Sequence, residues 1–182
     1  MDTKLGAVPS TYKSPSQIAR IITENWVEDN MFCVKCGHDK LHRLKNNSRF
    51  RDFECERCGN VCELKSTTSS IKNQILGGAY QAMVDRISSG EAPDLLVMRR
   101  SAKESLVQEL IIIPRSFLSL DIIRKRKPLS SRARRAGWTG GVILLKNIPG
   151  VARVKIIVDR EIRNKKEIVD EFGSVAEGID AD

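Results

Sequence analysis

The sequence predicts an α/β (α+β) fold, because helix-type and strand-type patterns are interspersed along one chain of 182 residues. Helices are indicated where apolar side chains recur every three or four positions. Strands are indicated where short runs rich in Val, Ile and Leu stop at proline or glycine. A chain of this length is typical of one domain with a substantial core. We therefore expect residues 1–182 to form a single domain.

Three helices and four strands follow from these patterns. The helix that starts at Pro15 packs an apolar stripe on the core. Glu24 on this helix is expected in solvent, and a position leaning towards the metal site is the alternative. The second helix is expected to be hinged at Gly77 and Gly78, because glycine is a poor helix former. The expected helices cover about residues 15–28, 71–88 and 165–172, and the expected strands cover residues 95–98, 107–113, 142–145 and 154–158.

Positive charge is concentrated in one part of the chain. The formal net charge is +8, yet no acidic residue occurs between Ile122 and Val158, where ten basic residues lie. A surface of one sign attracts polyanions, and nucleic acid is the usual one. The stretch from Arg124 to Arg135 is interrupted by Pro128 and is interpreted as a basic surface loop.

Cysteine usage and hydropathy indicate a reducing compartment. No apolar run approaches the ~20 residues of a membrane-spanning helix, and the first residues lack the apolar core of a signal peptide. We therefore expect a cytoplasmic protein, in which thiols stay reduced. Four of the five cysteines form two C-x-x-C pairs, which favours metal binding over disulfides.

The two C-x-x-C pairs predict a zinc-ribbon-like insertion over about residues 31–60. Gly37 suits a tight turn after the first pair. Four thiolates complete the tetrahedral shell of a structural zinc ion, so His38 and His42 are not needed as ligands. Cys62 is expected to pack as a small apolar residue. The predicted zinc ligands are Cys33, Cys36, Cys55 and Cys58.

A second set of polar residues is interleaved with the second cysteine pair. Glu63 and Lys65 are two positions apart, so on a strand they project from the same face while Leu64 points to the core. A carboxylate beside an ammonium can hold a divalent cation and a water side by side. Asp52 adds a second hard oxygen ligand of the kind that magnesium prefers. Charged residues also alternate on many exposed strand faces, so the spacing alone leaves both interpretations open.

Several groups of residues spread over the chain match one known family. They are Thr11-Tyr12-Lys13-Ser14, Ala19-Arg20-Ile21, Glu24-x-Trp26-Val27, both C-x-x-C pairs, Asp52-Phe53, Glu63-Leu64-Lys65-Ser66, Gly78-Ala79-Tyr80 and Ala133-Arg134-Arg135-Ala136-Gly137-Trp138. With these residues the chain resembles the catalytic domain of DpnI-like methyl-directed (Type IIM) restriction endonucleases, of the PD-(D/E)XK nuclease superfamily. The similarity runs from Thr11 to about Phe172.

The resemblance implies a mixed central sheet flanked by helices, with the zinc-bound insertion beside the active site. It implies magnesium-dependent hydrolysis of double-stranded DNA at GATC sites that carry 6-methyladenine, in a prokaryotic cytoplasm. Asp52, Glu63 and Lys65 would be catalytic. Asp52, Glu63 and the carbonyl of Leu64 would bind magnesium, and Lys65 would orient the attacking water. Such relatives carry a winged-helix domain after the catalytic unit, and its absence after Asp182 is expected to affect affinity and methyl-specificity.

The basic stretch supplies the expected DNA contacts. Lys125, Arg126 and Arg132 are assigned to phosphates, which position DNA without reading its sequence. Arg134 and Arg135 are candidates for reading guanine, and Trp138 offers a flat apolar wall for a methyl group. Further phosphate contacts and a packing tryptophan are the alternatives at these positions.

Two other functions stay open at this point. One is a zinc-ribbon DNA-binding module without activity, and the other is a nuclease of the same fold that acts in repair or on branched DNA. A partner protein or a separate DNA-reading domain is compatible with all three interpretations.

Overall fold

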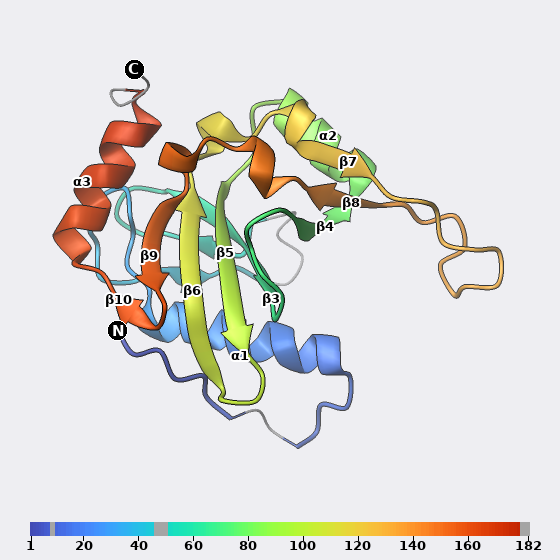
Figure 1. Ribbon diagram of the computed structural model, residues 1–182, viewed down its shortest axis with the longest axis horizontal. Helices are drawn as coiled ribbons and strands as arrows, with labels where there is room; N and C mark the ends of the chain where they lie inside the picture. Colours follow the sequence, from blue (N-terminus) through green and yellow to red (C-terminus); the bar gives the residue numbers. More distant parts are fainter. Residues whose placement is uncertain (8–9, 46–50, 179–182) are drawn as a thin grey trace.

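The computed structural model describes residues 1–7, 10–45 and 51–178 and arranges them in two sheets and three α-helices (Figure 1). The expected insertion over 31–60 is therefore described except for residues 46–50, which lie outside these ranges. The helices are α1 Pro15–Asn30, α2 Tyr80–Ser88 and α3 Lys165–Ala176. The strands are β1 His42–Arg43, β2 Phe53–Glu54, β3 Val61–Thr67, β4 Ile75–Ala79, β5 Asp94–Ser101, β6 Leu106–Ile113, β7 Ile123–Lys125, β8 Gly140–Ile143, β9 Val154–Val158 and β10 Glu161–Ile162.

The larger sheet has the strand order β1-β2-β3-β5-β6-β9-β10. β3 and β5 run parallel and the other neighbours run antiparallel, so the sheet is mixed, as predicted. At its centre, residues 95–98 and 110–113 are no more than 7% exposed. Continuous burial of this kind requires cover on both faces of a sheet. α1 contacts β3, and α3 lies against β9 (Figure 1).

The prediction of one hinged helix over residues 71–88 is wrong: a strand precedes the helix. Residues Ile75–Ala79 form β4, which pairs with β8, and α2 starts only at Tyr80. A Cβ on Gly77 would lie 2.6 Å from the sulfur of Met83, so the Met83 side chain of α2 packs directly on the glycine of this strand. β4, β8 and β7 form a second sheet, and α2 packs against it.

Other element boundaries differ from the prediction by a few residues. α1 continues to Asn30 and α3 to Ala176. Gly173 does not end α3, because burial of Phe172 and Val175 outweighs the ~1 kcal/mol that a helical glycine costs. The strand expected at 142–145 is β8, and Leu145 lies in the 3-10 turn Leu145–Asn147 that follows.

Residues 126–139, here called the basic loop, connect β7 to β8 and extend away from the body on the side of the smaller sheet (Figure 1). The surface loop predicted from Arg124 to Arg135 is confirmed from Arg126 onward, whereas Arg124 and Lys125 are wrongly assigned to it because they pair with β8 as part of β7. In the ranges that the structure covers, no helix combines the length and apolarity needed to cross a membrane.

Candidate active site and metal centre

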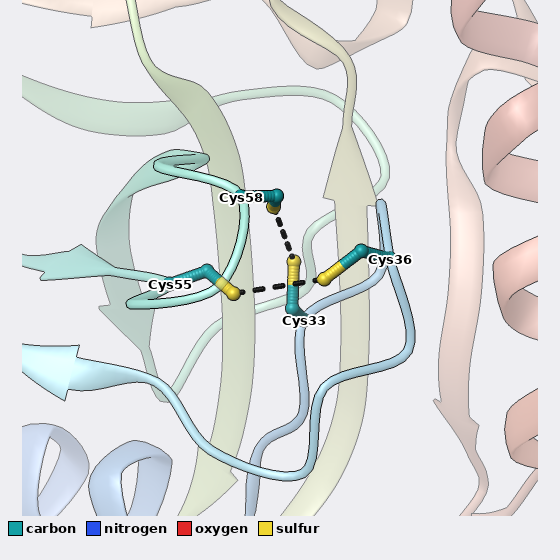
Figure 2. Close-up of side chains that lie close together, drawn as sticks. All are labelled: Cys33, Cys36, Cys55 and Cys58. Atoms are coloured by element: carbon teal, nitrogen blue, oxygen red, sulfur yellow. Dashed lines mark hydrogen bonds between the residues drawn. The ribbon is translucent and has the colours of Figure 1, made fainter.

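The four predicted zinc ligands lie together. Their sulfur atoms are all within 4.8 Å of one another, and Figure 2 shows the cysteines of one pair facing those of the other. The sulfur–sulfur distance is 3.6 Å between Cys33 and Cys58 and 3.7 Å between Cys36 and Cys55. Four zinc–sulfur bonds of ~2.3 Å in a tetrahedron separate the sulfurs by ~3.8 Å. The cluster therefore fits one zinc ion.

Both cysteine pairs sit in the same kind of tight turn. The amide of Gly37 donates to the carbonyl of Cys33, and the amide of Gly59 donates to that of Cys55, each at 2.8 Å. The φ angles of these glycines are +72° and +68°, a conformation that favours glycine. Burial raises the pKa of the Cys33 thiol, and hydrogen bonds to the backbone of Cys36 and Lys35 act against it. Such amides stabilise the thiolate form that binds metal.

The remaining cysteine and the two histidines stay out of the cluster, as predicted. Cys62 is 3% exposed in the core, and burial raises the pKa of its thiol. His38 and His42 both pair with Glu56, at 3.0 Å and 2.9 Å. The imidazoles thus have a carboxylate partner of their own.

The three predicted catalytic residues meet where the cysteine-bearing hairpin joins the larger sheet. Asp52 lies just before β2, and its Oδ2 accepts the N–H of Leu64 at 2.7 Å. Glu63 and Lys65 project from one face of β3, with Glu63 Oε1 2.5 Å from Lys65 Nζ. The side chains of Glu63 and Lys65 are 11% and 20% exposed, so the pair is largely shielded from water.

The carbonyl of Leu64 faces the same edge of β3 as Asp52. The N–H of Asp52 donates to the carbonyl of Cys62 at 3.0 Å, and the N–H of Leu64 points back to Asp52. In a strand, the N–H and C=O of one residue point to the same side. The Leu64 carbonyl therefore points to the edge of β3 where Asp52 lies, next to the face that carries Glu63.

This oxygen set fits a divalent cation. Burial raises the pKa of Asp52, and the charges of Glu63 and Glu24 raise it further, while the Leu64 amide and Lys65 lower it. Carboxylates that disfavour one another's charge are stabilised by a cation placed between them. Carboxylate and carbonyl oxygens are the ligands that Mg²⁺ prefers.

Sequence reasoning missed Arg86 of α2. Its Nη1 lies 3.1 Å from Glu63 Oε2, and its side chain is only 13% exposed. Glu63 is thus held by Lys65 on one oxygen and by Arg86 on the other. An arginine on an amphipathic helix resembles any solvated helix residue, so no pattern in the sequence indicates this contact.

The expectation that Glu24 is solvated is wrong. Glu24 is 7% exposed, and its negative charge helps to raise the pKa of Asp52. Its Oε1 accepts a hydrogen bond from Arg20 Nε at 2.6 Å, which compensates the buried carboxylate. The matched motif Glu24-x-Trp26-Val27 was the signal that favoured a place near the site.

A buried polar network fixes the start of β3. Asn60 directly follows the second cysteine turn and donates to Asp94 Oδ2 at 2.8 Å. Arg115 donates to Asn60 Oδ1 at 2.7 Å and to Asp94 Oδ1 at 3.1 Å. Asp94 is 2% exposed, so breaking this network would leave a buried charge unpaired. Glu63 lies three residues after Asn60 and is held in place through it.

The basic residues assigned to DNA are on the surface. Lys125, Arg126, Arg132, Arg134 and Arg135 are exposed.

Trp138 is half-buried, with the guanidinium of Arg135 4.5 Å from its ring centroid. A Cβ on Gly140 would lie 2.9 Å from the indole, so the ring packs against the start of β8. The packing alternative for Trp138 is therefore present, together with accessible ring surface.

The fold and the two clusters define a class: a mixed α+β protein with a cysteine cluster suited to zinc beside a cluster of carboxylates and a lysine. The model of the DpnI family, described as the Dam-replacing family, matches residues 2–177, and the chain belongs to this family. It is a DpnI-like methyl-directed restriction enzyme, and its partner is DNA.

Proposed function

We propose that the protein is a magnesium-dependent endonuclease that hydrolyses phosphodiester bonds of double-stranded DNA at GATC sites carrying 6-methyladenine. Membership of the family supports a methyl-directed restriction endonuclease. One observation carries the assignment to particular residues: Asp52 accepts the N–H of Leu64, between Glu63 and Lys65, although ten residues lie between Asp52 and Glu63 in sequence. The same-face placement of Glu63 and Lys65 supports the catalytic interpretation over that of a solvated strand face.

Each residue of the cluster has a distinct role in this proposal. Asp52, Glu63 and the Leu64 carbonyl hold magnesium, which when bound supplies charge neutralisation at the phosphoryl oxygens and lowers the pKa of water. Lys65 Nζ lies beside Glu63, where it orients the attacking water and stabilises the hydroxide as it forms. Arg86 keeps the Glu63 carboxylate in one orientation. The zinc ion is structural, because four thiolates leave it no open position.

Recognition of DNA is assigned to the basic loop and the end of β7. Lys125, Arg126 and Arg132 contact phosphates, and Arg134 and Arg135 hold the register by contacts with bases. The accessible part of the Trp138 ring receives the methyl group. A buried methyl contributes about 1 kcal/mol, so two methyls on a palindromic site give a preference of about tenfold to a hundredfold.

The test is a set of initial cleavage rates on three duplexes that differ only in methylation. We expect fully methylated GATC to be cut fastest, then hemimethylated, then unmethylated, and no cutting without magnesium. Equal rates on the three duplexes would contradict the specificity, and intact methylated DNA in magnesium would indicate a DNA-binding module. A branched duplex without GATC is tested alongside. Cleavage of this duplex would indicate a repair-type nuclease instead.

A further inference from the structure

A second group of cations surrounds Asp52, outside the basic loop. β1 and β2 pair with Arg43 opposite Phe53. The pairing continues one step further, where the N–H of Leu44 donates to the carbonyl of Asp52 at 2.8 Å. Extended by one more residue beyond this bond, the same register would bring Lys45 opposite Arg51. Like charges directly opposite each other destabilise an antiparallel pair, so this arrangement is unfavourable unless an anion lies between them.

These cations line one pocket with Asp52. Arg20, Glu24, Arg43, Lys45 and Arg51 form its walls together with Asp52.

Two of the cations have partners on α1. Arg20 pairs with Glu24 at 2.6 Å, and Arg43 pairs with Glu28 at 3.2 Å. Lys45 and Arg51 are exposed, and neither has an ion pair within the part of the chain that the structure describes. The pocket therefore presents two uncompensated cations beside the predicted catalytic carboxylate.

We propose that Lys45 and Arg51 bind one DNA phosphate next to the scissile phosphate, a contact separate from those of the basic loop. The inference rests on the proposed function, because it requires DNA to lie over Asp52. Arg51 immediately precedes Asp52, and successive phosphates of a strand are only about 3.4 Å apart along the duplex axis. A phosphate between the two cations relieves their repulsion and accepts charge-assisted hydrogen bonds from both. The α1 pairs keep the wall behind it in place.

The experiment combines substitutions in the protein with neutral phosphates in the DNA. Lys45→Met, Arg51→Met and the double variant are compared with wild type, and Lys166→Met is the control that removes one charge from α3. Binding to the methylated GATC duplex is measured by fluorescence anisotropy over a range of salt, with calcium replacing magnesium. The same duplex carries a methylphosphonate at each phosphate flanking the cut, one at a time. Zinc content shows that each variant is folded.

We expect the double variant to lower the slope of log Kd against log salt by about one, the contribution of one phosphate. Lys166→Met should leave the slope unchanged. One methylphosphonate position should weaken binding of wild type and have no further effect on the double variant. An unchanged slope, or equal weakening of both proteins at every position, would overturn the subsite. Failure of wild type to bind or cut the unmodified duplex would overturn the proposed function as well, which separates the two results.

Discussion

The segment of residues 52–65 and the basic loop differ in how their side chains are held. In the first, cysteine turns and a buried network fix the backbone, and Asp52 is tied to the next strand by the Leu64 amide. In the second, most backbone hydrogen bonds join residues of the loop itself, such as the one that the Leu129 N–H donates to the Trp138 carbonyl, and the arginines are exposed. Bond cleavage requires atoms fixed to a fraction of an ångström, whereas phosphate contacts need charge and tolerate adjustment. Substitutions in the first region should therefore abolish activity, and those in the second should reduce it only in part.

The largest expected effect comes from removing a zinc ligand. Cys55→Ser should lose the ~1 zinc per chain and with it cooperative folding, since structural zinc contributes on the order of 10 kcal/mol to small domains. Metal analysis and thermal unfolding measure both. Cys62→Ala is the matched control, because this buried cysteine lies outside the cluster and should keep its zinc. A Cys55→Ser protein with full zinc content and the wild-type Tm would show that the cluster does not hold the metal.

A smaller effect is expected from substitution of Arg86. It tests whether cleavage depends on the orientation of the Glu63 carboxylate as well as on its presence. Arg86→Met removes a charge-assisted hydrogen bond worth about 1.5–3 kcal/mol, which corresponds to roughly tenfold to a hundredfold in rate. It should also raise the magnesium concentration needed for half-maximal cleavage. Arg86→Lys should bring the cleavage rate and the magnesium requirement part of the way back to those of the wild type. Wild-type rate and magnesium dependence in Arg86→Met would rule out this role.

Trp138 tests whether the basic loop contributes selectivity as well as affinity. Trp138→Ala should bring the cleavage rates on methylated, hemimethylated and unmethylated duplexes closer together, by up to the tenfold to hundredfold that two methyls supply. Arg132→Ala is the control and should slow all three alike. If Trp138→Ala keeps the full methyl preference, the indole serves only for packing against β8.

The smallest effect is expected at Lys125, at the base of the loop. Lys125→Ala should weaken binding to all three duplexes by the same few-fold factor and reduce the salt slope by about one. A change confined to one duplex would mean that Lys125 reads the site rather than its backbone.

Local spacing was sufficient to predict the zinc cluster and the same-face placement of Glu63 and Lys65, whereas the catalytic interpretation of these residues and Asp52 depended on the family resemblance. The zinc ligands and the pairing of Glu63 with Lys65 depend on residues two to three apart in each segment, and such proximity is visible in a sequence. The mixed sheet was expected from the family resemblance, because strand order depends on pairing across long stretches of chain.

The contacts that escaped prediction are long-range ones. Arg86 reaches Glu63 of β3 from the helix α2, and Glu24 is buried because the hairpin carrying Asp52 covers that side of α1. Glycines inside a helix-like pattern predict a hinge, yet here they lie in the strand β4. Met83 packs directly against Gly77, a tertiary contact that the local pattern does not reveal.

The central claim is that Asp52, Glu63 and Lys65 form the catalytic centre on a scaffold held by zinc. The most direct measurement compares Asp52→Ala with wild type in single-turnover cleavage and in DNA binding, at equal zinc content. We predict that cleavage falls by at least about a thousandfold, since the variant lacks a metal ligand at the reacting phosphate. Binding should be unchanged or tighter, because one negative charge facing DNA is gone. Cleavage near the wild-type rate by a folded, zinc-loaded Asp52→Ala protein would contradict the claim.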